Sequence, residues 1–338
     1  MLKTSFMFLV NSYPLAVALC VVTMLCWGSW ANTQKMASKN WGFPLFYWDY
    51  TLGVVLLSLV FGLTLGSTGS TGEAFLPNLT HAEPTALTYA LLGGIVFNIA
   101  NLLLVAAIDI AGMAIAFPIG IGIALVLGVV VNYLAAPVGN PVLLFLGVGL
   151  IAFAIVLDAM AYKKISTGSA STKGILISLA AGILMGFFYR FVAASMSVDF
   201  EQPTPGLLTP YTAVFVFSIG VFLSNFVFNT FFMYRPVSGN KVRYADYFTQ
   251  GNLRLHAIGM LGGVIWCIGM LFNMIASGKA GFAISYGLGQ GATMVAAIWG
   301  VFVWKEFKSA PKGTNSFIYL MFLSFIAGLA LIIISRFA

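Results

Sequence analysis

The chain has 338 residues, of which 60% are hydrophobic and only 7% are charged, and its formal net charge is +7. This balance excludes an ordinary soluble domain and is typical of a chain that dissolves in lipid. The basic residues lie mostly in short loops and form no basic patch, so we expect no nucleic-acid partner.

Apolar runs long enough to cross a bilayer, which takes roughly 20 residues, follow one another along the chain. The first run is rich in tryptophan and lacks a small-residue cleavage pattern, so we interpret it as a retained helix rather than a signal peptide. The runs are too long and too uniformly apolar for barrel strands, and the predicted fold class is an all-α membrane protein. The predicted transmembrane helices are 13–33, 43–65, 86–108, 112–135, 141–161, 174–198, 208–233, 255–277, 280–304 and 315–336.

The distribution of basic residues over the loops predicts the orientation, because basic loops are retained on the cytoplasmic side. The other loops and both termini hold only three basic residues and several acidic ones. We therefore expect an inner or plasma membrane protein with both termini on the non-cytoplasmic side. One set of alternate loops carries Lys35, Lys39, Lys163, Lys164, Lys173, Arg235, Lys241, Arg243, Arg254, Lys305, Lys308 and Lys312.

The sequence matches itself without gaps at an offset of 169 residues, from 92–122 to 261–291. Weak internal symmetry of this kind is typical of transporters built from repeats. We predict two five-helix repeats, 1–165 and 166–338, which are inverted because five is odd. The identical pairs include Gly93 and Gly262, Gly94 and Gly263, Ile99 and Ile268, Leu102 and Leu271, Ala107 and Ala276, Ala111 and Ala280, Gly112 and Gly281, Ala114 and Ala283, Ile115 and Ile284, Gly120 and Gly289, and Gly122 and Gly291.

In inverted repeats the substrate site lies near the midplane, where interrupted helices of the two repeats meet. The paired interruptions expected here are Phe117–Gly122 and Tyr286–Gly291. Either could leave backbone groups free for a ligand, or its small residues could serve tight helix packing instead. The residues that define the two interruptions are Pro118, Gly120, Gly122, Gly287, Gly289 and Gly291.

Two charged residues lie well inside apolar runs. Arg190 is expected to face a cavity and to bind a carbonyl or carboxylate, or to act as a structural tie that reaches the outer interface or Asp199. Asp158 could relay the coupling ion, although pairing with Lys163 or Lys164 at the cytoplasmic edge explains it as well.

Neutral polar and aromatic side chains complete the predicted substrate site. Amides and a phenol can bind sugar hydroxyls or ring amides, and tryptophan can stack a flat solute, but the same groups also join or pack helices in lipid. The candidates are Trp30, Asn98, Asn101, Trp266, Tyr286 and Gln290, with Trp27 as a further tryptophan inside a span.

Several other features have simpler explanations. The aromatic cluster Phe46–Trp48 suggests an interfacial belt, and Asp49 and Asp109 suggest helix-end capping or turns. Asn78 begins a glycosylation sequon, and 166–174 has the composition of a flexible linker. No cysteine and histidine cluster has metal-ligand spacing, so we expect neither a metal nor a cofactor.

The segments Trp27–Ala31, Asp49–Leu52, Gly93–Val96 with Asn101, and Tyr211–Ser218 resemble the plant ureide permeases. Ten helices in two inverted repeats resemble the drug/metabolite transporter superfamily. The fourth helix also resembles the rhamnose and glucose/ribose porters. The resemblance implies ion-coupled import of a small polar solute, with both termini outside. The long central loop of the plant proteins is missing, so its regulatory role is not carried over.

The sequence therefore predicts a secondary transporter that imports a ureide, a nucleobase-like heterocycle or a monosaccharide by alternating access. A proton is the expected coupling ion, ahead of sodium, and the oligomeric state is left open. A metabolite or drug exporter is the main alternative. A membrane-embedded enzyme is disfavoured, because no nucleophile has a recognisable base nearby and His81 and His256 lie far apart.

Overall fold

A computed structural model describes residues 6–37, 41–165, 171–237 and 240–337. Ten of its helices or helix pairs are long and apolar enough to span a membrane, and no strand occurs within those ranges. The predicted fold class and number of spans are thus confirmed. The helices are α1 (Tyr13–Ser29), α2 (Ala31–Met36), α3 (Phe43–Leu63), α4 (Phe75–His81), α5 (Pro84–Ala111), α6 (Met113–Ala135), α7 (Pro141–Ile165), α8 (Thr172–Ser195), α9 (Pro210–Tyr234), α10 (Tyr244–Thr249), α11 (Leu253–Ala280), α12 (Phe282–Gly289), α13 (Ala292–Ile298), the π-helix Trp299–Val303 and α14 (Thr314–Ile334).

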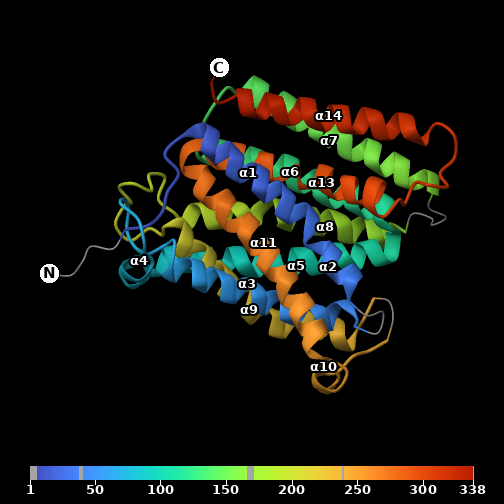
Figure 1. Cartoon of the computed structure of the whole chain (residues 1–338), viewed down its shortest axis with the longest axis horizontal. Coiled ribbons are helices and arrows are strands. Elements are labelled where there is room, and N and C mark those ends of the chain that lie inside the picture. The colour runs from blue at the N-terminus through green and yellow to red at the C-terminus, as the bar shows by residue number, and fades with distance from the viewer. Residues whose placement is uncertain (1–5, 38–40, 166–170, 238–239, 338) are drawn as a thin grey trace.

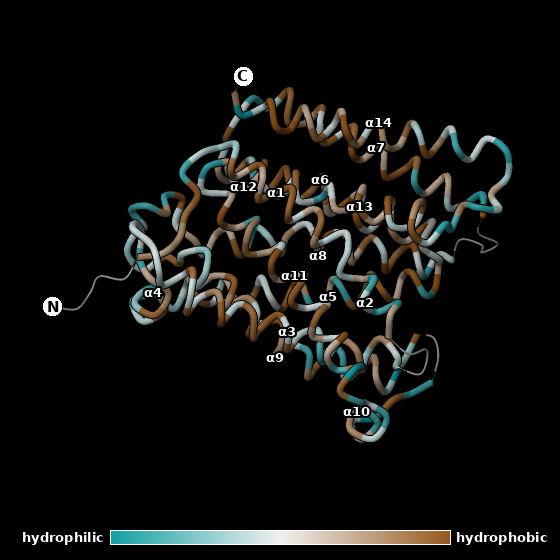
Figure 2. The backbone as a smooth tube through the Cα atoms, in the orientation of Figure 1, coloured by the Kyte–Doolittle hydropathy of each residue, from teal (hydrophilic) through white to brown (hydrophobic). Residues whose placement is uncertain are grey.

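The long helices run side by side across the molecule, and both termini lie at the same end (Figure 1). The helical spans are mostly apolar, and polar residues gather toward the two ends (Figure 2). We call the end that carries α2 and α10 the basic end, because Lys35, Lys241 and Arg243 lie there. Residues 166–170 of the expected linker lie outside the described residues.

The bundle is held together by a repeated pattern of helix pairs. Helix α5 packs along α8 and α9, while α11 packs along α1 and α3. Helices α7 and α14 pair along one edge of the bundle, and α3 and α9 pair on the opposite side (Figure 1). The helices between these two edges therefore enclose the centre of the molecule.

Two glycines let helices cross at very short distance. A Cβ atom at Gly94 would lie 2.1 Å from the carbonyl oxygen of Phe217, and one at Gly263 would lie 1.9 Å from that of Tyr50. Neither position has space for a side chain, so α5 touches α9 and α11 touches α3 through their backbones. Small residues serve this purpose in membrane helices generally.

The two expected interruptions differ in the structure. The ninth span is broken between α12 and α13, at Gln290 and Gly291, which lie inside the segment Tyr286–Gly291. The fourth is not: α6 is helical from Met113 to Ala135, with Pro118 inside it. Pro118 is the sixth residue of α6, where it removes a backbone hydrogen bond, yet the helix continues beyond it.

The glycines of α6 serve packing, at least in part. A Cβ atom at Gly182 of α8 would lie 2.6 Å from the carbonyl oxygen of Gly120, so α6 and α8 cross at this point. The small-residue alternative therefore holds at Gly120. Gly122 faces open space instead.

Candidate functional site

The indole of Trp266 lies at the centre of a buried aromatic cluster. Its ring centroid is 4.5 Å from that of Phe97, 5.8 Å from that of Phe217 and 5.9 Å from that of Trp27, and the last two rings stack on it. These residues come from α5, α9, α1 and α11. The central cluster, as we define it, comprises Trp27, Trp30, Tyr47, Tyr50, Phe97, Phe188, Phe217 and Trp266.

Two tyrosines of α3 extend this cluster toward the basic end. Tyr50 lies between Trp30 and Trp266, with ring centroids 4.8 Å and 6.4 Å away, and it stacks on Tyr47. The amide nitrogen of Asn101 donates to the Tyr47 hydroxyl over 3.1 Å. Three of the predicted site residues, Trp30, Asn101 and Trp266, are thus brought together by two tyrosines that sequence analysis did not select.

Two buried polar atoms beside the cluster have no hydrogen-bond partner among the described residues. The amide nitrogen of Asn98 donates to the Ser224 hydroxyl over 2.9 Å, which leaves the Asn98 carbonyl oxygen unpaired. The hydroxyl of Tyr50 is also unpaired, although the side chain is fully buried. Buried polar groups are normally satisfied, so these two atoms are available to a water or a ligand, as are the unpaired atoms of Trp41, Asn132, Asn225 and Asn229.

The broken ninth span packs against the same centre. The Tyr286 hydroxyl donates to the carbonyl oxygen of Ala124 in α6 over 3.0 Å, and a Cβ atom at Gly289 would lie 2.9 Å from the ring of Trp27. Gln290 is half-buried at the break. Tyr286 is therefore already bonded to the protein, while Gln290 directly follows Gly289, the residue that packs against Trp27.

Asn273 forms a hydrogen-bonded link that sequence analysis missed. It accepts from the Tyr189 hydroxyl over 2.6 Å and donates to the carbonyl oxygen of Ser285 over 2.8 Å, which joins α8, α11 and α12. A polar residue inside an apolar run is the signal that pointed to Asn98, and it applies equally to Asn273.

The two charged candidates lie apart from the central cluster. Arg190 is half-buried on α8, and within the described residues no hydrogen bond or ion pair joins it to Asp199 or to any other residue. Asp158 is half-buried on α7 near Glu306, and the described ion pairs do not include the expected one with Lys163 or Lys164.

Glu306 joins three segments at the basic end. It accepts from the Lys35 ammonium over 2.8 Å and from the Tyr162 hydroxyl over 2.5 Å. Partial burial opposes ionisation of this carboxyl, but the hydrogen bonds from Lys35 and Tyr162 outweigh it and lower the pKa of Glu306. The loop after the ninth span is thereby fastened to α2 and α7.

Asp49 is not a helix cap, contrary to the prediction. It lies inside α3, where its buried carboxylate accepts from the Tyr247 hydroxyl of α10 and lies 3.0 Å from Nδ1 of His256 in α11. Burial and the neighbouring Asp49 carboxylate raise the pKa of Tyr247, so its phenol stays a donor at neutral pH. The sequence gives no sign of this contact, because three separate segments form it.

The aromatic residues around Asp49 are also inside the protein. Phe46 and Tyr47 are fully buried and Trp48 nearly so, and the indole nitrogen of Trp48 donates to the sulfur of Met233 over 3.3 Å. The prediction of an interfacial belt at Phe46–Trp48 is therefore wrong. Residues of an interfacial belt face lipid headgroups, whereas these face α9 and the centre.

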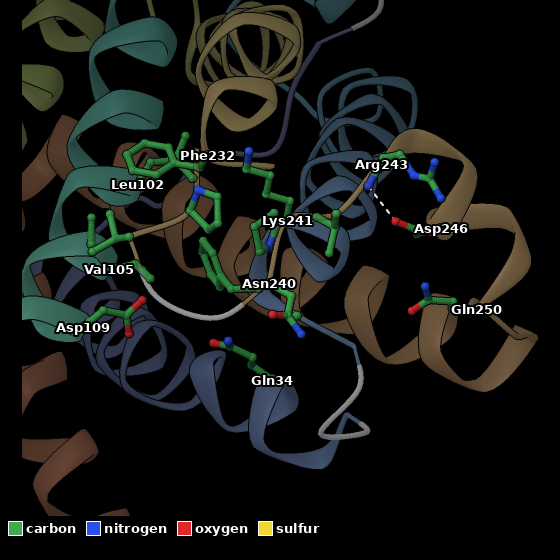
Figure 3. Close-up of a pocket in the computed structure, with 17 residues that line it drawn as sticks. Gln34, Leu102, Val105, Asp109, Phe232, Asn240, Lys241, Arg243, Asp246 and Gln250 are labelled. Atoms are coloured by element: carbon green, nitrogen blue, oxygen red, sulfur yellow. Dashed lines mark hydrogen bonds between the residues drawn. The ribbon is translucent and has the colours of Figure 1, made fainter. Parts of the chain in front are cut away.

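A pocket of about 850 Å³ opens at the basic end (Figure 3). Phe43 and Leu102 line it, and behind them the ring of Phe43 stacks on Tyr47, with centroids 5.0 Å apart. The pocket thus ends one layer of side chains from the central cluster. Its polar and charged lining residues are Gln34, Asp109, Asn240, Lys241, Arg243, Asp246 and Gln250.

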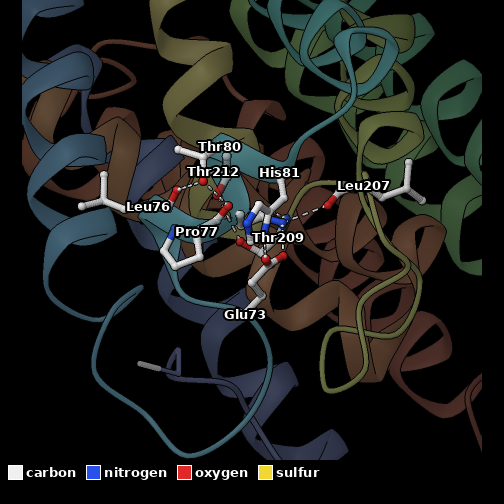
Figure 4. A network of polar contacts seen from close by, with 9 residues as sticks. Glu73, Leu76, Pro77, Thr80, His81, Leu207, Thr209 and Thr212 are labelled. Carbon is white, nitrogen blue, oxygen red and sulfur yellow. Dashed lines mark hydrogen bonds and ion pairs between the residues drawn. The ribbon is translucent and has the colours of Figure 1, made fainter. Parts of the chain in front are cut away.

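A polar network closes the opposite end between α4 and the start of α9 (Figure 4). Asn78 donates to Glu73 over 2.8 Å and accepts from the backbone N–H of Thr209 over 2.9 Å, and Glu73 also contacts His81. Asn78 is only 1% exposed, so it is not available for glycosylation, contrary to what its sequon suggests.

Comparison with known proteins shows the family. The Ureide permease family profile matches residues 46–171 and 163–335. Ureide permease 1 and ureide permease 2 of Arabidopsis thaliana are each 23% identical to this chain, over 97% of it and 99% of the relative. The probable ureide permease A3 of Vigna unguiculata is 22% identical, over 90% of the chain and 99% of the relative.

A solved crystal structure shares the fold, with a TM-score of 0.60, 14% identity, and coverage of 94% of this chain and 96% of the other. The alignment with ureide permease 1 runs over 388 residues, more than the 338 of this chain, so the relative has residues without a counterpart here. The family and the relatives are named as permeases, which are transporters and not enzymes. The chain belongs to the ureide permease family.

Proposed function

We propose that this protein imports a ureide, or a related planar heterocycle with amide groups, through the central cluster by proton symport. The observation that carries the proposal is the pair of unpaired polar atoms, Asn98 Oδ1 and Tyr50 Oη, beside the rings around Trp266. A ureide carries N–H donors and carbonyl acceptors in one plane. Its N–H can donate to Asn98, its carbonyl can accept from Tyr50, and its plane can stack on an indole.

The relatives supply the chemical class of the solute. They are named as ureide permeases, and 99% of the length of ureide permeases 1 and 2 aligns with this chain. A monosaccharide, as the sequence also allowed, has hydroxyls that could use the same polar atoms but no flat amide group. The proposal includes the relationship to the drug/metabolite transporter superfamily, and to its rhamnose and glucose/ribose porters, that the sequence predicts.

Alternating access of two inverted repeats is the proposed mechanism. The helix pairs support it. In the two proposed repeats, α5 corresponds to α11, α8 to α1 and α9 to α3. The contacts of α5 with α8 and α9 therefore correspond to those of α11 with α1 and α3, and all four pairs are in contact. Rocking of one unit against the other would move Trp266 relative to Phe97, which belong to different units, and so open the cluster to one end at a time.

The proposed orientation places the basic end in the cytoplasm and both termini outside, in an inner or plasma membrane. The pocket lined by Lys241 and Arg243 would then be the cytoplasmic vestibule. A reporter fused to the C-terminus tests this placement. Access of a membrane-impermeant reagent from outside is expected, and access only after permeabilisation would contradict it.

Arg190 is a separate candidate, because within the described part of the chain no hydrogen bond or ion pair joins it to the central cluster. It would contribute a donor to a solute carbonyl if it turned inward in another conformation. The variant Arg190→Gln tests this role. Uptake and binding equal to those of the wild-type would remove Arg190 from the site.

Uptake into proteoliposomes tests the proposed function. Purified protein is reconstituted, a pH gradient is imposed, and labelled allantoin, uracil and glucose are offered separately. Gradient-driven accumulation of allantoin or uracil that saturates is expected, with matching thermal shifts in detergent. Accumulation of glucose alone would assign the protein to sugars, and loss of preloaded solute under an acidic exterior, without any uptake, would indicate an exporter that exchanges solute for protons.

A further inference from the structure

Asp49 has the features of a proton-binding site. Its side chain is only 2% exposed, yet both carboxylate oxygens lie 3.0 Å from Nδ1 of His256, and the Tyr247 hydroxyl donates to one of them. Removing a carboxylate from water costs several kcal/mol unless such partners are present. The three residues, from α3, α11 and α10, form what we call the Asp49 clamp.

The backbone around the clamp is shaped to fit it. A Cβ atom at Gly259 would lie 2.4 Å from Cβ of Asp49, and one at Gly251 would lie 2.3 Å from Nε2 of His256. Glycine at position 259 lets α3 and α11 approach closely enough for the carboxylate and the imidazole to meet, and glycine at position 251 lets the loop before α11 lie against the imidazole. The contact is therefore an integral part of the helix packing.

The clamp joins the two helices that meet at the central cluster. In α3, Asp49 directly precedes Tyr50, and in α11, His256 lies on the same helix as Trp266, whose ring centroid is 6.4 Å from that of Tyr50. Any change that loosens the clamp frees these two helices at the basic end. It therefore acts on the same helices that hold the proposed solute site.

A proton can reach Asp49 through His256. The His256 side chain is 24% exposed, whereas Asp49 is shielded. The ring of Trp41 lies edge-on to the imidazole, with centroids 5.3 Å apart, and the ring of Tyr247 also contacts it, with centroids 4.6 Å apart. His256 is thus the connection between the buried carboxylate and solvent at the basic end.

The other charged groups on the helices around Asp49 are hydrogen-bonded elsewhere or exposed to solvent. Asp246 of α10 accepts from the backbone N–H of Arg243 over 2.7 Å, and Arg254 of α11 is exposed. The sequence of α9 contains no charged residue. Tyr247 keeps its proton, since burial and Asp49 raise its pKa. Among the described residues, proton exchange in the clamp therefore falls to Asp49 and His256.

We propose that Asp49 binds the coupling proton, with His256 as its relay, and that protonation of Asp49 releases the clamp between α3 and α11. An ionised carboxylate holds the Tyr247 and His256 donors by charge-assisted hydrogen bonds, which are about twice as strong as neutral ones. The neutral acid holds them less tightly, so the two helices separate at the basic end and open the central cluster toward the pocket. This assignment rests on the proposed function.

Counterflow and gradient-driven uptake separate proton coupling from solute binding. In proteoliposomes, Asp49→Asn is expected to exchange labelled for unlabelled allantoin within about twofold of the wild-type rate, because the amide mimics the protonated acid. Its accumulation ratio under a pH gradient is expected to fall to one. Asp158→Asn, the other carboxylate inside a span, is the matched comparison. Wild-type accumulation by Asp49→Asn, or loss of coupling in Asp158→Asn alone, would overturn the assignment.

A measurement without solute keeps the clamp testable if the proposed substrate is wrong. The amide hydrogen exchange rate of residues 244–260, corrected for its intrinsic pH dependence, is expected to rise on acidification in the wild-type. In Asp49→Asn it is expected to be high at every pH. His256→Asn is the second variant, should Asp49→Asn fail to fold, and is expected to lose the pH response as well. Exchange that is independent of pH in the wild-type would refute the clamp, whereas absence of any allantoin uptake would refute only the proposed function.

Discussion

Gly112 and Gly281 occupy equivalent positions in the two halves of the chain and adopt nearly the same backbone conformation. Their φ and ψ angles are 78° and 158° for Gly112, and 85° and 152° for Gly281. Each donates its N–H over 2.8 Å to the carbonyl oxygen four residues earlier, on Ile108 and on Ser277. Since these positions also match in sequence at the offset of 169, the turn geometry favours the proposed duplication.

The two glycines predict a graded loss of stability on substitution. This region of φ and ψ is open essentially to glycine alone, and strain there costs about 1–3 kcal/mol. Gly112→Ala meets no atom within 4 Å and should show the backbone cost alone, whereas a Cβ at Gly281 would also lie 2.9 Å from Val138. We expect Gly281→Ala to lower the melting temperature in detergent more than Gly112→Ala does. Equal or unchanged values would contradict the strain argument.

Tyr47 and Tyr50 offer a matched pair for testing the solute site. Tyr50→Phe removes a buried hydroxyl that has no partner, so the empty protein should be as stable as the wild-type or more stable by about 1 kcal/mol, while solute affinity falls. Tyr47→Phe instead breaks the bond with Asn101 and should lower stability. Thermal unfolding with and without allantoin measures both effects. Unchanged allantoin binding in Tyr50→Phe would remove that hydroxyl from the site.

The number of helices is predictable from sequence because each apolar run is long enough to span a bilayer by itself. The contacts that build the site are not. Asp49 and His256 are 207 residues apart, and no periodicity relates them. Phe97 and Phe217 look like ordinary lipid-facing residues until the crossing at Gly94 brings their helices against Trp266. Sequence patterns therefore identified Trp266 as a candidate but not the rings around it.

Pro118 shows that sequence patterns can also predict an interruption that does not form. Proline and glycine suggest an interruption, but whether a helix breaks also depends on how it packs against its neighbours. In α6 the close approach of Gly182 to Gly120 holds the helix against α8, and it stays continuous. In the ninth span, Gln290 and Gly291 form a turn.

The network around Asn78 predicts a structural rather than a glycosylation role. Asn78→Ala leaves the backbone N–H of Thr209 without its acceptor, and an unsatisfied buried donor costs about 1–3 kcal/mol. Thr80→Ala also destroys the sequon but leaves the Asn78 contacts in place. We therefore expect a lower melting temperature in Asn78→Ala and almost none of that effect in Thr80→Ala. A similar loss in both variants, or a glycan on Asn78, would contradict the structure.

Glu306 predicts an acid-sensitive component of stability at the basic end. Burial is outweighed by the hydrogen bonds from Lys35 and Tyr162, which hold the pKa of Glu306 below its usual 4.5. A carboxyl with a lowered pKa in the folded state stabilises the protein above pH 4.5 and loses that contribution as the pH falls through the lowered value. Wild-type protein should therefore be more stable than Glu306→Gln at neutral pH, and the difference in melting temperature should shrink below pH 4.5.

Glu201 provides the control for this prediction, because it forms an ion pair with Lys279 over 2.7 Å in which the two side chains are 49% and 35% exposed. Exposed pairs contribute little, since water screens them and two long side chains must be ordered. Glu201→Gln should thus unfold almost as the wild-type does at every pH. If Glu201→Gln reproduced the pH-dependent loss of Glu306→Gln, the effect would come from overall charge and not from the link between Lys35, Tyr162 and Glu306.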